Sequence, residues 1–321
     1  MGGGALPETM AALRVHALGD GPRPDRLPVP RPGPGEVLLR LAASVIGHHD
    51  LDVAGGTLSF HPPLPYVPGL EGAGRVASIG ADVDRARFPV GALARVFGGG
   101  LGATRPGTWA EYVVAPADVV TLVPEELDVT LAAACGSVAL TAWSAAIDLG
   151  GLQPDESLGV TGASGAVGSL VLQLAEQHGV ARRVAWVRSP ERAALVPVGT
   201  EVVAGDEPVE PVDLLVDTVG GPLLAKRLRS VRRGGRAVLV GYTAGTRLCF
   251  ELPDLLAADV SLLPLNMRRR RPPPDLEARL VVDFAAGRLR VATEAVELAD
   301  LDDAIERLNG AGAAGRVVLT W

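Results

Sequence analysis

A glycine-rich stretch at residues 160–168 carries the clearest chemistry in this sequence. Gly162, Gly165 and Gly168 stand between an apolar segment and a segment with helical periodicity. Glycines at this spacing permit a tight turn, a close approach of backbone to phosphate, and close packing of helix on strand. The free N–H groups that begin the helix then meet a pyrophosphate. The alternative is an ordinary turn between a strand and a helix. The predicted contacts are Gly162, Ala163, Ser164, Gly165, Ala166, Val167 and Gly168.

The segment after the next apolar strand bears on which nucleotide binds. Sites for NAD usually place an acid about 20 residues after the glycines, where it holds the ribose 2′-hydroxyl. Here the strand at 184–187 leads into Arg188, Ser189 and Arg192. Guanidiniums offer planar, permanently charged donors, so this segment favours the 2′-phosphate of NADPH. Two alternatives stay open: Glu191 holds the ribose of NADH, or the segment is an arginine-rich loop with Ser189 as a helix N-cap.

Length and composition limit the class of protein. The 321 residues suffice for two domains, and 48% hydrophobic with 21% charged residues is typical of globular proteins. A net charge of −7 argues against a nucleic-acid partner. Two cysteines exclude a disulfide framework and a four-cysteine zinc site. Neither a membrane-length apolar run nor a signal peptide is visible, so we expect no membrane partner and a cytoplasmic location.

The order of the expected elements places the glycine loop in an α/β region. Residues 1–9 are expected to be a disordered extension, and residues 10–130 contain short strands punctuated by glycine and proline. From residue 131 strands alternate with helices, which predicts a doubly wound parallel sheet. The expected strands are 11–17, 36–43, 72–79, 93–96, 110–114, 158–161, 184–187, 201–203, 213–218, 237–241, 260–263, 293–297 and 316–319. The expected helices are 131–149, 167–178, 222–231, 274–286 and 301–309.

A series of short motifs in this order resembles the medium-chain dehydrogenase/reductase superfamily. They are residues 32–37, 68–74, 107–112, 140–143, the glycine loop, 217–220, 234–241 and 315–319. The resemblance covers residues 10–321. It implies an α/β fold in which a GroES-like β-rich domain (10–130 and 272–321) accompanies a Rossmann dinucleotide-binding domain (131–271), with the active-site cleft between them.

The zinc-dependent branch of that superfamily binds its catalytic metal through Cys, His and Cys in three motifs. This sequence has Gly47 and Leu70 at the first two positions, and Ser137 at the third, with Cys135 close by. A catalytic zinc normally needs three protein ligands, so we predict no metal. The sequence therefore resembles the zinc-free quinone oxidoreductase and enoyl reductase branch.

His48 and His49 follow the first of these positions. Neighbouring histidines in a strand or turn point in different directions, which disfavours a metal site shared with Asp50 or His61. The resemblance implies a substrate contact or proton donor near the nicotinamide. The alternative is a structural role or a contact with cofactor phosphate. The tyrosine proton donor of some enoyl-thioester reductases would fall within residues 54–57, which contain no tyrosine.

The resemblance implies further cofactor contacts at the ends of later elements. These are Thr141, Thr218, Val219, Gly241, Tyr242 and Asn266. Each has an alternative as a turn or packing residue. The basic run Arg268, Arg269, Arg270 and Arg271 is either a solvated loop or an anchor for an anionic substrate tail, such as a CoA or carrier-protein phosphate.

Together these features predict an NADPH-dependent, zinc-independent oxidoreductase. It would transfer hydride to an activated C=C of an α,β-unsaturated carbonyl, or to a quinone, so its partner is a small electrophilic molecule. The first alternative is a biosynthetic tailoring reductase or cyclase with one narrow substrate. The second is a non-catalytic NADPH-binding protein. We also expect a homodimer, because the last parallel strand at 260–263 leaves an apolar edge that needs covering.

Overall fold

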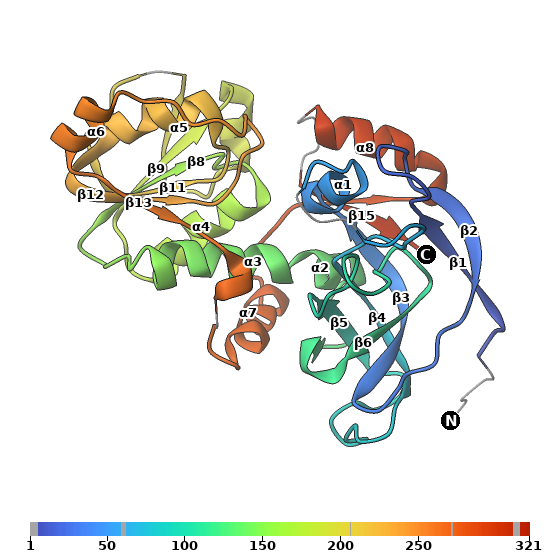
Figure 1. The fold of residues 1–321 in the computed structure, drawn as a ribbon. Helices are drawn as coiled ribbons and strands as arrows, with labels where there is room; N and C mark the ends of the chain where they lie inside the picture. The colour runs from blue at the N-terminus through green and yellow to red at the C-terminus, as the bar shows by residue number, and fades with distance from the viewer. Residues whose placement is uncertain (1–5, 59–61, 206, 271, 311–314) are drawn as a thin grey trace. The chain divides into compact units, whose positions relative to one another are not determined.

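The computed structural model describes residues 6–58, 62–205, 207–270, 272–310 and 315–321, and the chain divides into two units (Figure 1). Unit 1 comprises Met1–Ser137 and Glu277–Trp321, and unit 2 comprises Val138–Leu276. The first strand begins at Thr9, the last residue of the predicted extension, whereas residues 1–5 lie outside the described chain.

Unit 1 is built on a seven-stranded sheet that contains the long strand β3 (Glu36–Ile46). Successive side chains of a strand point to opposite faces. Accordingly, Leu38 and Ile46 pack into one core, whereas Val37, Leu39 and Leu41 pack into another. The other strands of the unit are β1 (Thr9–Arg14), β2 (Arg23–Pro28), β4 (Glu71–Ile79), β5 (Leu93–Phe97), β6 (Tyr112–Pro116), β7 (Val120–Leu122), β14 (Thr293–Val296) and β15 (Arg316–Thr320).

Among the described residues, four α-helices accompany these strands. They are α1 (His48–Ala54), α2 (Val129–Ala134), α7 (Leu276–Ala285) and α8 (Leu301–Asn309). The strand order is β14-β15-β3-β4-β5-β7, with β6 also paired to β3, while β1 and β2 form a separate antiparallel pair. The central strand β3 therefore joins segments from both ends of the chain.

Unit 2 contains a six-stranded parallel sheet in the order β10-β9-β8-β11-β12-β13. The strands are β8 (Ser157–Thr161), β9 (Arg182–Val187), β10 (Glu201–Ala204), β11 (Val212–Asp217), β12 (Val231–Leu239) and β13 (Ser261–Pro264). The helices are α3 (Gly136–Trp143), α4 (Ala166–Gln177), α5 (Gly221–Arg227) and α6 (Leu252–Ala258). Helices α5 and α6 lie on one side of the sheet and α4 on the other (Figure 1). The prediction of a doubly wound parallel sheet is confirmed, and its order is that of a dinucleotide-binding fold.

Several local predictions differ from the structure. The single helix predicted at 131–149 consists of α2, α3 and a π-helical segment, Ser144–Leu149, because the helical path is interrupted after Ala134. The predicted helix 222–231 ends at Arg227 and continues as a 3₁₀ turn to Ser230. Strand β2 and helices α1 and α6 were not predicted, since each is only six or seven residues long and lacks a sustained apolar period.

A membrane crossing requires a long helix of apolar character. Among the residues that the structure describes, no helix combines that length with that character.

Candidate functional site

The carboxyl ends of the parallel strands in unit 2 meet at one edge of the sheet. Neighbouring strands β8 and β11 lie at the point where the strand order reverses, which is where open α/β sheets bind their ligands. The predicted glycine loop follows β8, and Thr218 follows β11 directly. Unit 2 therefore brings these two predicted segments together.

The outer glycines of the loop are required by close packing. Gly162 has a φ of +64°, and a Cβ there would lie 2.3 Å from Thr218 Oγ1 and 2.8 Å from Val219 Cγ1. A Cβ on Gly168 would lie 2.4 Å from the Gly162 carbonyl oxygen and 2.9 Å from the Ala163 Cα. Any side chain at these two positions would separate the loop from its neighbours or push the helix off the strand.

The middle glycine leaves the helix end open. Gly165 is exposed and is the N-cap of α4, and it has no side chain to bind the first N–H groups of the helix. The first turn of a helix carries unsatisfied N–H groups and a partial positive charge. Gly165 thus leaves the start of this twelve-residue helix accessible to an anion, so the loop residues fit a dinucleotide pyrophosphate.

A buried carboxyl group that the sequence analysis did not identify ties the two strand ends together. Asp217, the last residue of β11, accepts a hydrogen bond from the Thr161 hydroxyl at the end of β8, and both residues are 0% exposed. The Gly220 N–H donates to the same carboxyl group at 2.7 Å. The Thr218 hydroxyl donates back to the Thr161 carbonyl at 2.8 Å. Burial raises the pKa of Asp217.

The sequence contained part of the signal for this contact. Residues 217–220 formed one of the recognised motifs, but only the pairing of β11 with β8 shows that Asp217 lies opposite Thr161. The resulting contact fixes the loop that carries Thr218 and Val219.

The predicted nucleotide-selecting residues follow β9, beside β8. Arg188 is exposed, while Ser189 and Arg192 are half-buried at the start of a 3₁₀ helix, Pro190–Leu195. The Ser189 hydroxyl donates to Glu191 and is the largest cause of the lowered pKa of that carboxyl group. Ser189 is the N-cap residue of this 3₁₀ helix and Pro190 begins it, although the Ser189 side chain makes no capping hydrogen bond.

The segments that follow β12 and β13 lie at the same carboxyl edge of the parallel sheet. Gly241 packs so closely that a Cβ would lie 2.2 Å from the Thr218 carbonyl oxygen, whereas Tyr242 is 47% exposed. The Asn266 side chain accepts a hydrogen bond from the Arg268 N–H at 3.0 Å and caps a short 3₁₀ turn. Thr141 is half-buried on α3.

The structure describes three of the four arginines in the basic run at residues 268–271. Arg270 forms an ion pair with Asp148 at 3.2 Å, and Arg268 and Arg269 are exposed. Arg271 lies outside the described residues.

The two predicted catalytic histidines lie in unit 1, on a helix and not in the strand or turn that we expected. Helix α1 begins at His48, which is exposed, and His49 is half-buried. The next residue, Asp50, is buried and accepts a hydrogen bond from the Gly47 N–H at 3.1 Å. The third histidine considered, His61, falls outside the described residues.

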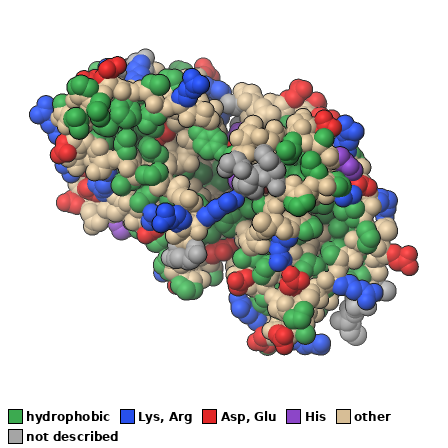
Figure 2. Space-filling view, in the orientation of Figure 1, with side chains coloured by type: hydrophobic (Ala, Val, Ile, Leu, Met, Phe, Trp, Pro, Cys, Tyr) green, Lys and Arg blue, Asp and Glu red, His purple; other side chains and the backbone are tan. Residues whose placement is uncertain are grey.

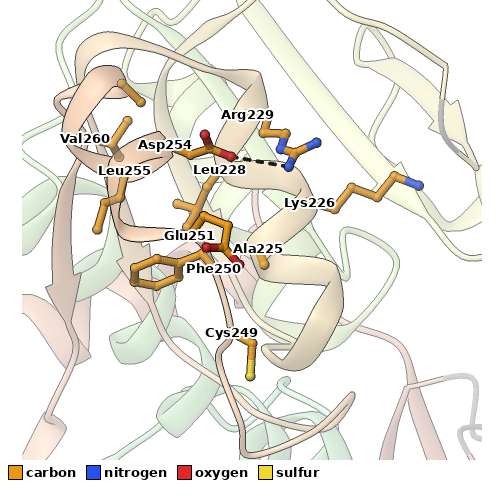
Figure 3. A pocket seen from close by; sticks show the side chains of 11 residues that line it. Ala225, Lys226, Leu228, Arg229, Cys249, Phe250, Glu251, Asp254, Leu255 and Val260 are labelled. Carbon is orange, nitrogen blue, oxygen red and sulfur yellow. Dashed lines mark ion pairs between the residues drawn. The ribbon is translucent and has the colours of Figure 1, made fainter.

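A separate cavity of about 360 Å³ lies in unit 2 between α5 and the segment that includes α6 (Figure 3). Leu228, Phe250 and Leu255 are among its apolar walls, and an ion pair of 3.6 Å joins Arg229 to Asp254 beside it. None of its lining residues belongs to the predicted site. Hydrophobic side chains gather on the surface of this region (Figure 2).

The comparisons with known proteins agree with this architecture. The family described as "Alcohol dehydrogenase GroES-like domain" matches residues 33–125, and "Zinc-binding dehydrogenase" matches residues 196–319. An alcohol dehydrogenase of Geobacillus stearothermophilus is 30% identical over 89% of this chain and 91% of that protein. Human quinone oxidoreductase is 28% identical over 97% of each chain.

Solved structures are similar over almost the full length. A structure described as an NAD-dependent alcohol dehydrogenase is 26% identical, with a TM-score of 0.85 over 97% of this chain and 100% of that one. A mycobacterial quinone oxidoreductase is 25% identical, with a TM-score of 0.81 over 97% of this chain and 100% of that one.

The second family description names zinc. By the resemblance described above, the three positions of the family's catalytic ligands are Gly47, Leu70 and Ser137, with Cys135 close to the third. Among the described residues, no group of three His, Cys, Asp or Glu side chains is arranged to hold a metal ion. With the sequence relatives, the solved structures and the two-unit fold in agreement, the chain belongs to the medium-chain dehydrogenase/reductase superfamily and is an oxidoreductase of that family.

Proposed function

We propose that this protein is an NADPH-dependent, zinc-independent reductase of activated double bonds or quinones. One observation supports the binding of a dinucleotide in particular. The first turn of α4 has no capping side chain at Gly165, and it lies next to the site where Gly162 packs closely against Thr218. That arrangement supports a pyrophosphate site formed by backbone N–H groups. The relatives include proteins named quinone oxidoreductase and proteins named alcohol dehydrogenase.

The residues after β9 support NADPH over NADH. Arg188 and Arg192 supply positive charge where a 2′-phosphate would need it. Glu191 is the residue that would hold a ribose diol, but its carboxylate already accepts the Ser189 hydroxyl. Binding NADH through Glu191 would therefore compete with an existing hydrogen bond.

The residue types favour an activated electrophile as substrate. A bound nicotinamide would supply the hydride. The protein has to bind and orient the substrate and provide a proton for the reduced product. An unactivated carbonyl group usually needs a Lewis acid to polarise it, and this chain lacks the ligands of the family's zinc at Gly47, Leu70 and Ser137. A conjugated enone or a quinone can accept hydride when its carbonyl oxygen is polarised by hydrogen bonds alone, without a metal ion. His48 and His49 are the proposed substrate contacts or proton donors.

A titration and a substrate panel test the proposal. Chelator-treated protein is titrated with NADPH and NADH, and NADPH oxidation is then followed at 340 nm with cyclic enones, acyclic enones and quinones. Tighter binding of NADPH with turnover of one of these classes supports the proposal. Turnover of only one complex biosynthetic substrate would favour the tailoring reductase or cyclase. NADPH binding without turnover on any electrophile would favour a non-catalytic protein, and binding of neither cofactor would contradict the assignment of the glycine loop.

We also propose a homodimer formed through unit 2. Strand β13 is the last strand of its sheet, and among the described residues no strand pairs with its outer edge. In the preceding helix, Leu252 is 59% and Leu256 is 70% exposed, one helical turn apart. An uncovered edge strand next to exposed leucines favours pairing with a second copy across a two-fold axis.

A further inference from the structure

The basic run after β13 is a feature of unit 2 that the proposed function does not use. Residues 268–271 are four arginines, and residues 260–274 contain neither aspartate nor glutamate. The whole chain carries a net charge of −7, so the sign of the charge is reversed in this segment. A cluster of like charges at a surface raises the local concentration of ions of opposite sign. Arg268 and Arg269 are both exposed, so an anion in solution has access to them.

The turn that carries the two exposed arginines is held on both sides. The Leu265 N–H donates to a carbonyl oxygen of β12 at 2.9 Å, which keeps the chain against the sheet beyond the end of β13. The Asn266 side chain then caps the 3₁₀ turn Met267–Arg269. After the turn, Arg270 forms its ion pair with Asp148 at 3.2 Å. The exposed arginines therefore stand on a short turn between two anchored positions.

Strand pairing gives the position of this turn along the carboxyl edge of the sheet. One row of paired residues crosses the sheet there, from β9 to β13: Trp186, Thr161, Asp217, Leu239 and Pro264. Neighbouring strands lie about 4.8 Å apart, so β9 and β13, which are separated by β8, β11 and β12, are about 19 Å apart. Arg188 follows the row shortly after β9, and Arg268 follows it shortly after β13.

The proposed cofactor site leaves the β13 end of this edge to the substrate. In that site the pyrophosphate lies at the start of α4, after β8, and the 2′-phosphate lies near Arg188, after β9. A dinucleotide binds across the point where the strand order reverses, so the nicotinamide half would extend in the other direction, towards β12 and β13. That half carries no 2′-phosphate. The arginines after β13 are therefore placed for an anionic group of the substrate.

The number of charges indicates the kind of anion. Asp148 compensates one guanidinium of the run, that of Arg270. A carboxylate would compensate one more, whereas a phosphate ester carries nearly two negative charges at neutral pH and offers three acceptor oxygens. Guanidiniums also match phosphate oxygens with paired donors. Two neighbouring exposed arginines thus favour a phosphate, and their place on the surface favours a phosphate that is remote from the reacting double bond.

We propose that Arg268 and Arg269 form an anion site that binds a phosphate on the tail of the substrate. This inference rests on the proposed function, because it names the substrate class of that reaction: an α,β-unsaturated carbonyl compound with a phosphate-bearing tail. Thioesters of coenzyme A and of a carrier protein share this chemistry, since both contain the phosphate of phosphopantetheine.

Steady-state kinetics with two matched substrates at saturating NADPH tests the inference. Crotonyl-coenzyme A carries phosphates, and crotonyl-N-acetylcysteamine is the same enoyl thioester without them. The wild-type KM should be at least about tenfold lower for the coenzyme A ester. Arg268→Ala/Arg269→Ala should raise that KM at least about tenfold with kcat unchanged, because the lost contact is equally strong in the ground state and the transition state. The KM of the N-acetylcysteamine ester and the Kd of NADPH should not change.

A matched control removes the same amount of charge from the same sheet. Arg229→Ala/Arg233→Ala replaces two exposed arginines that flank the start of β12, at the opposite edge. Its KM for crotonyl-coenzyme A should equal that of the wild type. Arg268→Lys/Arg269→Lys keeps the charge but loses the paired donors, so its KM should lie between those of the wild type and the alanine variant.

Crotonyl-phosphopantetheine, which has a single phosphate, distinguishes the two sources of the tail. A KM similar to that of crotonyl-coenzyme A would assign the site to the phosphopantetheine phosphate, which a carrier protein also provides. A KM similar to that of the N-acetylcysteamine ester would assign it to the nucleotide phosphates of coenzyme A. Both results support the anion site.

A binding measurement keeps this inference separate from the proposed function. If neither crotonyl thioester is reduced, the proposed function fails, and the Kd of butyryl-coenzyme A in the presence of NADP⁺ decides the inference. That Kd should rise at least about tenfold in the Arg268→Ala/Arg269→Ala variant and stay unchanged in the control. The inference is overturned if the coenzyme A ester responds no more than in the control, if both crotonyl thioesters lose affinity together, or if NADPH loses affinity instead.

Discussion

The Thr161 hydroxyl donates a hydrogen bond to the Asp217 carboxyl group and so joins the ends of β8 and β11. These two strands flank the point where the sheet order reverses, and both side chains are fully buried. The bond holds the turn that carries Thr218 against Gly162. A contact made entirely inside unit 2 thus determines the shape of the proposed cofactor site.

The first prediction concerns that contact. Asp217→Ala leaves the Thr161 hydroxyl and the Gly220 N–H buried without their acceptor, which should lower the free energy of unfolding by about 3 kcal/mol. It should also weaken NADPH binding, because the turn with Thr218 loses its anchor. Urea unfolding and fluorescence titration measure the two effects. Asp213→Ala is the matched control, since Asp213 binds Ser157 at the opposite end of the same strand; it should leave the Kd for NADPH unchanged.

The second prediction separates backbone strain from steric contact at the glycine loop. Gly162 and Gly151 have similar φ values, +64° and +58°, but only Gly162 has other atoms within 4 Å of the place where a Cβ would lie. Alanine at either position should lower the free energy of unfolding by about 1 kcal/mol, because a residue with a side chain rarely adopts a left-handed backbone conformation. Gly162→Ala should in addition raise the Kd for NADPH at least about tenfold, as measured by calorimetry. Equal affinities of the two variants would show that the loop does not form the cofactor site.

The third prediction concerns cofactor selection. If Arg188 binds the 2′-phosphate, Arg188→Ala removes a charge-assisted hydrogen bond worth about 2 kcal/mol, which is about 30-fold in Kd. NADPH affinity should fall by that factor while NADH affinity stays the same, and Arg192→Ala should act in the same direction. Arg233→Ala, at an exposed position before the Gly234 turn, is the control. A parallel loss for both cofactors would place Arg188 outside the 2′-phosphate site.

The fourth prediction follows from the pKa of Asp50. Burial raises this pKa from 3.8 to about 6, so the folded state holds the proton more tightly than the unfolded state. The protonated Asp50 side chain therefore adds about 3 kcal/mol to the stability of the folded state. This contribution is fully present below pH 4 and is lost as the pH rises through 6. Asp50→Asn removes this component. The stability of the variant relative to wild type should therefore increase between pH 4 and pH 7, and a pH-independent difference in urea unfolding would contradict the assignment.

The sequence predicted the long-range architecture better than the buried polar contacts. The alternation of apolar strands with helices after residue 131 was sufficient for the parallel sheet, because period and order are local properties. Helix α1 was missed because a seven-residue helix that starts with two histidines and an aspartate has no apolar stripe. The hydrogen bonds of Asp217 and the ion pair of Arg316 with Glu71 depend on which strands lie together, and no local pattern contains that information. Arg316 lies 245 positions from Glu71 along the chain.

The fifth prediction concerns the oligomeric state. If α6 and the edge of β13 form a two-fold interface, light scattering should give twice the chain mass of 33.1 kDa. Leu256→Glu places a charge at a 70% exposed position on α6 and should shift the mass toward that of the monomer. Val198→Glu, at a 93% exposed position, should not. A monomeric wild type at micromolar concentration would exclude this interface.

The most direct measurement is the rate of NADPH oxidation by protein that has been treated with a chelator and assayed on a cyclic enone and a quinone. The account predicts turnover of one of these substrate classes that is unchanged by added Zn²⁺ and is faster with NADPH than with NADH. An enzyme that is inactive after chelation and regains activity with Zn²⁺ would contradict the zinc-independent reaction.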